Sequence, residues 1–165
     1  MVTIKYFLFY SFLYIGVCGC AQSKSIVTNM YGTYTVHLPG NVAVDKEGNI
    51  LSARDTLNVI YIESASDRIQ WTRAWKNDKA YSVLTRIISA SSLDAGIDKI
   101  TNKKVIVPLA KGNKLYQLQL IPLEENTTSP GEKSRGDIIL EGSYNGKKIM
   151  QKITQLTELM AIPSV

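Results

Sequence analysis

Apolar and polar side chains alternate along most of the chain after residue 30, over short stretches that end at turn-forming residues. An alternation of period two is typical of β-strands that bury one face and expose the other. Tyr31–Leu38 shows the pattern clearly, because the even-numbered residues from Tyr34 onward are apolar and the odd-numbered ones are threonine or histidine. Pro39-Gly40 then ends the predicted strand.

Two further strands are predicted before residue 65. Val42 and Val44 begin a short strand that ends at the turn-forming stretch Lys46–Asn49. Thr56–Glu63 (TLNVIYIE) is rich in β-branched and aromatic residues. We therefore expect it to form a strand that is buried on both faces at its centre.

The first predicted hairpin joins Arg68–Lys76 to Lys79–Ile88 through the two-residue turn Asn77-Asp78. This register gives two cross-strand pairs on one face, Trp71 with Leu84 and Trp75 with Ala80. A second hairpin is predicted from Val105–Leu109 and Lys114–Leu123, which flank Lys111-Gly112-Asn113. In its second strand Tyr116, Leu118 and Leu120 share a face. The loop 122–136 that follows has fifteen mostly polar residues, a length that is often mobile or functional.

The third predicted hairpin turns at Asn145-Gly146, the favoured pair for a type I′ turn. Its register places one set of side chains toward a core, namely Ile138, Leu140, Ile149 and Ile153. The opposite face carries mostly polar residues, namely Ile139, Glu141, Ser143, Lys148, Met150 and Lys152. One side of this hairpin therefore faces a core and the other faces water.

Two segments lack a clear alternation. Ser89–Lys99 is expected to hold a single helical turn, capped by Ser91 or Ser92. Gln155–Ile162 fits either an extension of the preceding strand or a short helix, and its periodicity does not decide between them.

Many short strands joined by hairpins predict a mainly β fold, an antiparallel β-sandwich of about 7–9 strands with little helix. We expect residues 31–165 to form one such domain, because no shift in composition divides them. The segment 20–30 is short and mostly polar, and we expect it to be a flexible tether.

The first 19 residues follow a different pattern. Lys5 is the only charged residue before Lys24, and Tyr6–Val17 is a run of twelve uncharged, mostly apolar residues. A basic start followed by a short apolar core is typical of a secretory signal peptide. The run is shorter than the roughly 20 residues that a membrane-spanning helix needs, and an uncleaved anchor helix is the alternative interpretation.

Both cysteines of the chain, Cys18 and Cys20, follow this run. A disulfide between them would close a tight and strained ring. Val17-Cys18-Gly19-Cys20 resembles the lipobox of bacterial lipoproteins, in which a small residue precedes the cysteine that is lipidated and becomes the new N-terminus. The resemblance implies that the signal peptide 1–19 is removed and that Cys20 anchors the protein to a membrane. It implies nothing about the fold of the domain.

The same resemblance carries expectations about location. No Asp follows Cys20, which by the sorting rule of such lipoproteins implies the outer membrane. Residues 21–25 lack the acidic cluster that marks surface export in some lipoproteins, so a periplasm-facing position is expected. A lipidated Cys20 would also leave no free thiol for catalysis or metal binding.

The charge of the chain gives no sign of a nucleic-acid partner. The net charge is +5, and basic residues after residue 20 are interspersed with acidic ones, as in Asp45-Lys46-Glu47. Nucleic-acid binding usually needs a concentrated basic face.

The sequence contains no recognisable catalytic or metal-binding motif. His37 is the only histidine, and we expect it to be an ordinary surface residue. The chain has no Gly-x-Ser-x-Gly, Ser-x-x-Lys or His-Glu-x-x-His pattern, no phosphate-binding glycine loop and no calcium-loop spacing. We therefore predict no catalytic residue, no metal site and no cofactor.

Trp71, Arg73 and Trp75 form the one cluster that suggests ligand binding. In a regular strand all three stand on the same side. If the indoles are exposed, they could stack on a sugar ring or a partner's peptide, with cation–π contacts from the guanidinium. If they are buried, the tryptophans belong to the core, which is the commoner place for large aromatic residues in strands.

These observations lead to three hypotheses for function, of which an enzyme is the least favoured, because no catalytic motif is present. The first is a non-catalytic outer-membrane lipoprotein with a protein partner in an envelope assembly. Its size, lipobox and many strands are similar to those of small lipoproteins that secretion machines, including type VI systems, use as membrane anchors. The second is a carbohydrate- or peptide-binding module that uses Trp71, Arg73 and Trp75.

Overall fold

The computed structural model describes residues 25–37, 46, 55–123 and 136–161. Within these ranges the chain forms ten strands and no helix. The strands are β1 (Val27–His37), β2 (Asp55–Ser64), β3 (Gln70–Lys76), β4 (Lys79–Ile88), β5 (Ser92–Ile97), β6 (Lys104–Pro108), β7 (Lys114–Pro122), β8 (Ile138–Tyr144), β9 (Lys147–Ile153) and β10 (Leu156–Leu159). The prediction of a mainly β fold is confirmed.

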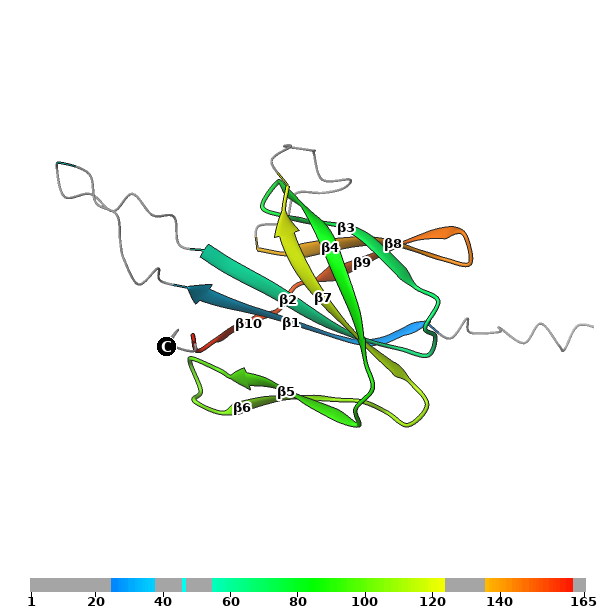
Figure 1. The fold of residues 1–165 in the computed structure, drawn as a ribbon, viewed down its shortest axis with the longest axis horizontal. Helices are drawn as coiled ribbons and strands as arrows, with labels where there is room; N and C mark the ends of the chain where they lie inside the picture. Colours follow the sequence, from blue (N-terminus) through cyan, green and yellow to red (C-terminus); the bar gives the residue numbers. More distant parts are fainter. Residues whose placement is uncertain (1–24, 38–45, 47–54, 124–135, 162–165) are drawn as a thin grey trace, which may run out of the picture.

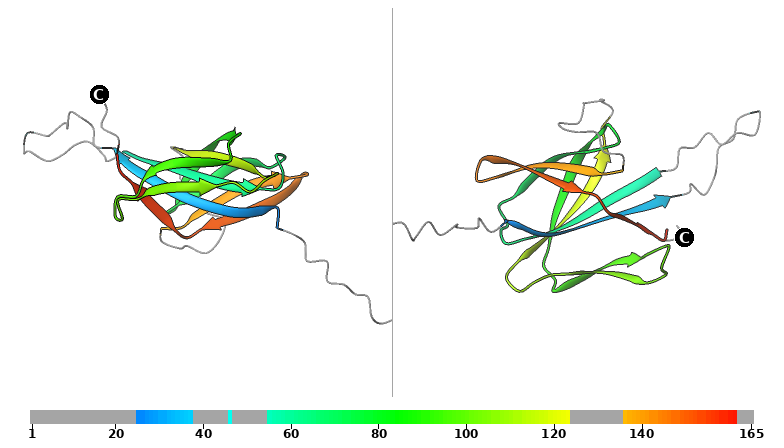
Figure 2. Two further views of the ribbon diagram at one scale, coloured as in Figure 1. Left: turned by 90° about the horizontal axis from the view of Figure 1, so that it is seen from below. Right: turned by 180° about the vertical axis from the view of Figure 1, so that it is seen from behind.

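Eight strands form one sheet in the order β10-β1-β2-β7-β4-β3-β8-β9, and β5 and β6 form a separate two-stranded hairpin (Figure 1). β9 and β10 stand at opposite ends of this order, although only Thr154 and Gln155 separate them in the chain. The sheet is therefore curled, as the two views in Figure 2 show. One pairing departs from the expected antiparallel pattern, since β1 and β10 run parallel.

Gly32 makes room for the passage from β9 to β10. It pairs with Leu156, the first residue of β10. A Cβ atom at Gly32 would overlap Leu156 Cδ2, and it would lie 3.0 Å from Ile153 Cγ2 and 3.1 Å from the Gln155 carbonyl oxygen. Any side chain at this position would push β10 away from β1.

The interior of the curled sheet holds the main core. Its buried residues come from seven strands and the segment before β3, and they are Val27, Ile60, Ile62, Ile69, Trp71, Ala74, Tyr81, Tyr116, Leu118, Leu120, Ile138, Leu140 and Ile153. The predicted inward face of β7 (Tyr116, Leu118 and Leu120) and that of the β8–β9 hairpin are confirmed, with Ile149 packed against the same cluster. β2 is buried on both faces at its centre, as predicted, because Ile60 and Ile62 are buried in the main core and Tyr61 is buried on the opposite face of the strand.

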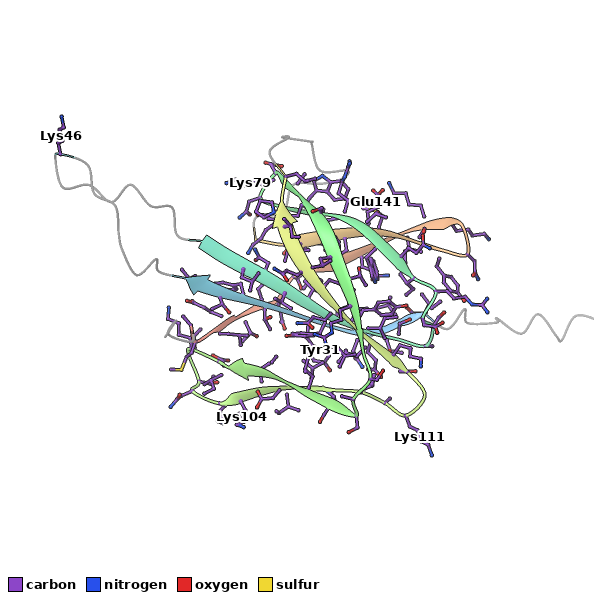
Figure 3. All side chains as sticks on the ribbon, viewed as in Figure 1. Tyr31, Lys46, Lys79, Lys104, Lys111 and Glu141 are labelled. Atoms are coloured by element: carbon purple, nitrogen blue, oxygen red, sulfur yellow. The ribbon has the colours of Figure 1, made fainter. Side chains whose placement is uncertain are left out.

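The β5–β6 hairpin packs on the outer face of the curled sheet. A second, smaller cluster lies between them, with Tyr61, Val107 and Leu115 buried at its centre. Tyr31 of β1 packs against this cluster, between the sheet and the hairpin (Figure 3). The molecule therefore has a large core inside the sheet and a small one outside it.

The two predicted two-residue turns are confirmed. Asn77 and Asp78 have φ of 49° and 64°, and Asn145 and Gly146 have φ of 49° and 74°. Positive φ at both positions is the requirement of a type I′ turn. The predicted pair Trp75–Ala80 also forms, whereas the β3–β4 pairing ends at Arg73–Ser82 and does not reach the predicted pair of Trp71 with Leu84.

The helical turn predicted in Ser89–Lys99 is wrong, because Ser92–Ile97 forms β5. Leu93 and Ala95 of this strand pack against the outer cluster. Burial of these side chains against the sheet outweighs the local preference of the serines for a helix cap, since tertiary packing commonly overrides propensity.

The hairpin predicted from Val105–Leu109 and Lys114–Leu123 is also wrong, although both strands exist. β6 pairs with β5, and β7 lies between β2 and β4. Leu115 and Tyr116 explain the difference, because these consecutive residues are buried on opposite faces of β7. Such a strand needs a neighbour on each side and cover on each face, which β6 alone could not supply.

The first strand begins inside the predicted tether. Residues 20–30 were expected to be a tether, but β1 starts at Val27, whose side chain is in the main core. The predicted strand at Val42 and Val44 lies outside the described residues, as does most of the predicted loop 122–136.

Candidate functional site: a groove beside the outer hairpin

A groove with a cavity volume of about 610 Å³ opens between the β5–β6 hairpin and the end of the curled sheet. Its lining is mainly apolar and comes from segments far apart in the sequence, namely Thr35, Leu57, Asp94, Ala95, Gly96, Ile97, Lys104, Leu159, Met160 and Ala161. Thr35 and Leu57 are neighbours on β1 and β2 and form the floor. The groove is large enough for one or two side chains of a ligand or of a partner protein.

An irregularity in β5 shapes one wall of the groove. The β5–β6 register shifts between Asp94 and Gly96, and Gly96 has a φ of 128°. Asp94 Oδ1 accepts a hydrogen bond of 3.0 Å from the Gly96 N–H and so fixes this bend. The bend brings Gly96 close to Leu159, the last residue of β10. Glycine is required here because its φ lies in the region that side chains disfavour.

At one end of the groove, hydrogen bonds and an ion pair connect the β5–β6 turn to β10. The Lys99 N–H donates to the Glu158 carbonyl oxygen at 2.9 Å, and the Met160 N–H donates to the Ile97 carbonyl oxygen at 2.8 Å. Lys99 Nζ also forms an ion pair of 2.5 Å with Glu158 Oε1. Tyr34 Oη donates to the other carboxylate oxygen, Glu158 Oε2, at 3.1 Å.

The charges at this end are compensated. The Lys99 ammonium and then the Tyr34 hydroxyl hold the pKa of Glu158 below its ordinary value. At the rim of the groove Lys104 Nζ lies 3.1 Å from Asp94 Oδ2 (Lys104 is labelled in Figure 3), and this contact and the Gly96 N–H lower the pKa of Asp94. The two charged residues in the described lining of the groove, Asp94 and Lys104, are thus paired with each other. Its lining residues offer apolar contact rather than a free acid, base or nucleophile.

The groove lies far from the point where the chain enters the domain. β1 starts at Val27 and reaches the groove at Thr35, eight residues later. At about 3.3 Å per residue this separation is roughly 26 Å. In Figure 1 the end of β1, the β5–β6 turn and the end of β10 share one side of the molecule, opposite the start of β1.

The predicted Trp71, Arg73 and Trp75 cluster is not a flat platform. Trp71 pairs with Gly142 and Arg73 pairs with Glu141, so Thr72 is an extra residue and forms a β-bulge. The bulge turns Trp71 into the main core with Ala74, while Arg73 lies over the Trp75 ring, with Cζ 6.0 Å from its centroid. The expectation that all three stand on one side is wrong.

Both indoles are buried, with only 5% of Trp71 and 4% of Trp75 exposed, which agrees with the core alternative. Their Nε1 atoms form no hydrogen bond within the described part of the chain. Neither indole therefore presents a face for a sugar ring. Gly142 accommodates Trp71 at the bulge, since a Cβ atom there would lie 2.9 Å from Trp71 Cε3.

Two other predicted residues have a limited structural description. Cys20, the predicted lipidation site, lies outside the described residues. His37 is the last residue of β1 and pairs with Asp55 through the backbone.

A half-buried ammonium lies at the same end of the sheet, on its inner face. Lys76 Nζ donates to Asn58 Oδ1 at 2.8 Å and stands 5.2 Å from the centroid of the Tyr34 ring. Burial lowers the pKa of Lys76. Among the described residues its hydrogen-bond acceptor is the neutral Asn58 amide.

Sequence reasoning missed the groove entirely. Its residues come from five separate segments, and none belongs to a recognisable motif. Only a correct prediction of β5 and of the β1–β10 pairing could have brought them together.

Comparison with known proteins adds no relative: no family model, no curated protein and no solved structure matches the chain significantly. Among the described residues, the structure has no helix that could cross a membrane. The same residues contain no group of three or more His, Cys, Asp or Glu side chains arranged to hold a metal ion.

Proposed function

We propose that this protein is a non-catalytic lipoprotein of a bacterial envelope, anchored through Cys20 at the outer membrane and facing the periplasm. In this proposal its β domain holds a partner protein of an envelope assembly, such as a secretion machine. The groove beside the β5–β6 hairpin is the contact site, and it takes an apolar segment of that partner.

The position of the groove is the observation that supports this proposal most directly. A lipid at Cys20 would place the start of β1 toward the membrane, whereas the groove lies about eight residues along β1 at the other end of the domain. A groove in that position is accessible to a periplasmic partner. Its lining is mainly apolar, and its two charges neutralise each other, which favours an uncharged apolar segment over a charged ligand.

Exposed apolar residues around the groove agree with a protein contact. Ile97 is 39% exposed and Met160 is 43% exposed, and both line the groove. Large apolar side chains that remain exposed around a concave site commonly mark an interface.

The test uses full-length lipidated protein, captured with its partners from detergent-solubilised membranes. Ile97→Asp places a charge in the groove and should reduce the amount of co-purified partner at least about tenfold. Ile100→Asp is the matched control, because Ile100 is 87% exposed on the nearby turn and does not line the groove. Equal loss in both variants, or in neither, would contradict the groove as contact site.

A separate variant tests the anchor. Cys20→Ser should move the protein from the membrane fraction to the soluble periplasmic fraction. Continued membrane attachment after this change would favour an uncleaved N-terminal helix and overturn the lipoprotein assignment.

A further inference from the structure

The second half of β4 has an open edge. β4 pairs with β3 only from Lys79 to Ser82, but it continues to Ile88 and pairs with β7 along its other side as far as Ile88–Leu115. β3 pairs with β8 along its other edge throughout, and before its bulge at Thr72 its residues Gln70 and Trp71 pair with β8 alone. The segment 83–88 therefore has no strand beside it on the β3 side within the described part of the chain.

The backbone of this edge carries N–H and C=O groups that have no partner among the described residues. In a two-residue hairpin the pair that flanks the turn, here Lys76–Lys79, exchanges backbone hydrogen bonds, and every second pair after it does the same. By this alternation the N–H and C=O groups of Thr85 and Ile87 point to the β3 side. No strand among the described residues accepts or donates there. A row of unpaired groups of this kind is a template for another strand.

Arg86 is the one charged side chain along the edge 83–88, and the other side chains there are apolar or uncharged. Leu84 is 57% exposed and Ile87 is 44% exposed, and these residues stand on opposite faces of the strand. The edge strand β9, at one end of the sheet, differs from this part of β4 because it contains three lysines, Lys147, Lys148 and Lys152. Edge lysines are a common defence against unwanted strand pairing.

The charge around the edge indicates what would bind there. β3 and β4 contain no acidic residue, whereas they contain Arg73 and Arg86, both exposed. Neither arginine takes part in an ion pair with another described residue. A strand with carboxylates would be attracted to this edge.

A second copy of the chain fits the edge poorly. Antiparallel pairing of two 83–88 segments would bring the Arg86 side chains of the two copies close together, and like charges at such positions are destabilising. The edge is better matched to an acidic strand from another protein.

We propose that the β4 edge, residues 83–88, is a strand-addition site for an extended segment of a partner protein that alternates apolar residues with Asp or Glu. The backbone groups of Thr85 and Ile87 bind its main chain, Leu84 and Ile87 contact its apolar side chains, and Arg86 pairs with a carboxylate. This site is separate from the groove and does not depend on the lipid anchor.

The test selects ligands from a displayed library of random ten-residue peptides against the full-length protein in detergent. Selected sequences are expected to alternate apolar residues with Asp or Glu. On binding, the amide hydrogens of Thr85 and Ile87 are expected to become protected from exchange with solvent.

Three variants sharpen this test. Thr85→Pro removes an edge N–H that makes no bond to β7, so it should reduce the affinity of the protein for the selected peptides at least about tenfold. Thr85→Ala keeps this N–H and should leave the affinity within about twofold. Arg86→Glu should reverse the preference to peptides with lysine in place of the acidic residue, a change that misfolding could not produce.

Several results would overturn the proposal. These are the absence of any enriched peptide, enriched peptides that lack acidic residues, equal binding to the Thr85→Pro variant, or protection of both amides in the free protein. A concentration-dependent dimer that Thr85→Pro abolishes would overturn it in favour of a second copy of this chain.

Discussion

The inside and the outside of the curled sheet bury apolar residues on very different scales. The inner cluster draws on seven strands and includes seven residues that are almost completely inaccessible, namely Ile60, Ile62, Ala74, Tyr116, Leu118, Ile138 and Leu140. The outer cluster has three buried residues, and the β5–β6 hairpin that covers it has only Val107 fully buried. The inner core sets the stability of the fold, while the hairpin is an attached element.

Polar contacts at both ends compensate for the small outer core. At one end Glu63, which is 2% exposed, accepts hydrogen bonds from Asn29 Nδ2 at 2.6 Å, Asn113 Nδ2 at 2.6 Å and the Ala110 N–H at 2.9 Å. These bonds tie the β6–β7 connection to β1. At the other end the hairpin turn meets Glu158 of β10 through Lys99. The groove lies beside this second, more exposed attachment.

Leu118→Ala tests the inner core and has the largest expected effect. Removal of a fully buried leucine should lower the free energy of unfolding by about 3–5 kcal/mol, because it leaves a cavity among well-packed neighbours. Val107→Ala in the outer cluster deletes two carbon atoms where Leu118→Ala deletes three, and it should cost about 1–2 kcal/mol. Urea denaturation measures both, and an equal or larger loss for Val107→Ala would remove the distinction between the two cores.

Gly32→Ala tests the contact between β1 and β10 at the start of β10. The new methyl group would collide with Leu156 and force β10 away from β1, so we expect a loss of about 1–3 kcal/mol in the same measurement. Gly146→Asn is the control, because asparagine tolerates the positive φ of that turn and the site is open. A neutral Gly32→Ala would mean that β10 is not tightly held.

Glu63 gives the stability of the protein a dependence on pH. Its hydrogen bonds, with that from Asn29 the largest contributor, hold the pKa of the folded carboxyl below its ordinary value. The carboxylate therefore stabilises the fold fully above the pKa of an unfolded glutamate, and this contribution is lost as the pH falls toward the lower folded-state pKa.

Glu63→Gln should lower the free energy of unfolding at neutral pH by about 1.5 kcal/mol, since it replaces an acceptor oxygen by a donor group. It should also flatten the decrease in stability between pH 6 and pH 3. Chemical denaturation at a series of pH values measures this, and an unchanged acid profile would show that Glu63 does not carry the effect.

Lys99→Gln should have the smallest effect. The Lys99–Glu158 ion pair is partly exposed, with 56% of the Lys99 side chain and 21% of the Glu158 side chain accessible, and such pairs add little to global stability. We expect faster hydrogen exchange in residues 97–103 without a measurable change in the unfolding midpoint. Lys103→Gln is the control, because Lys103 is exposed and forms no ion pair with a described residue. A lower unfolding midpoint for Lys99→Gln would instead make this contact part of the main cooperative unit.

Local patterns in the sequence predicted the local features well. The turns at Asn77-Asp78 and Asn145-Gly146 follow from residues that tolerate positive φ, and the inward faces of β7, β8 and β9 follow from simple alternation. The platform of Trp71, Arg73 and Trp75 failed because a bulge at Thr72 rotates Trp71 to the other face. Bulges depend on the neighbouring strand, here on the space at Gly142, and leave little local signal.

The sequence alone determined that this chain is mainly β and where its tight hairpins turn, and the proposal of a lipid on Cys20 rests on the sequence alone. The tertiary structure decided which strands are neighbours, and therefore placed β5 and β6 on the outer face, opened the groove and left the edge of β4 unpaired. The physical reason is that strand formation depends on alternation within a few residues, whereas strand pairing depends on burial shared between segments such as Gly32 and Leu156 that are distant in the chain.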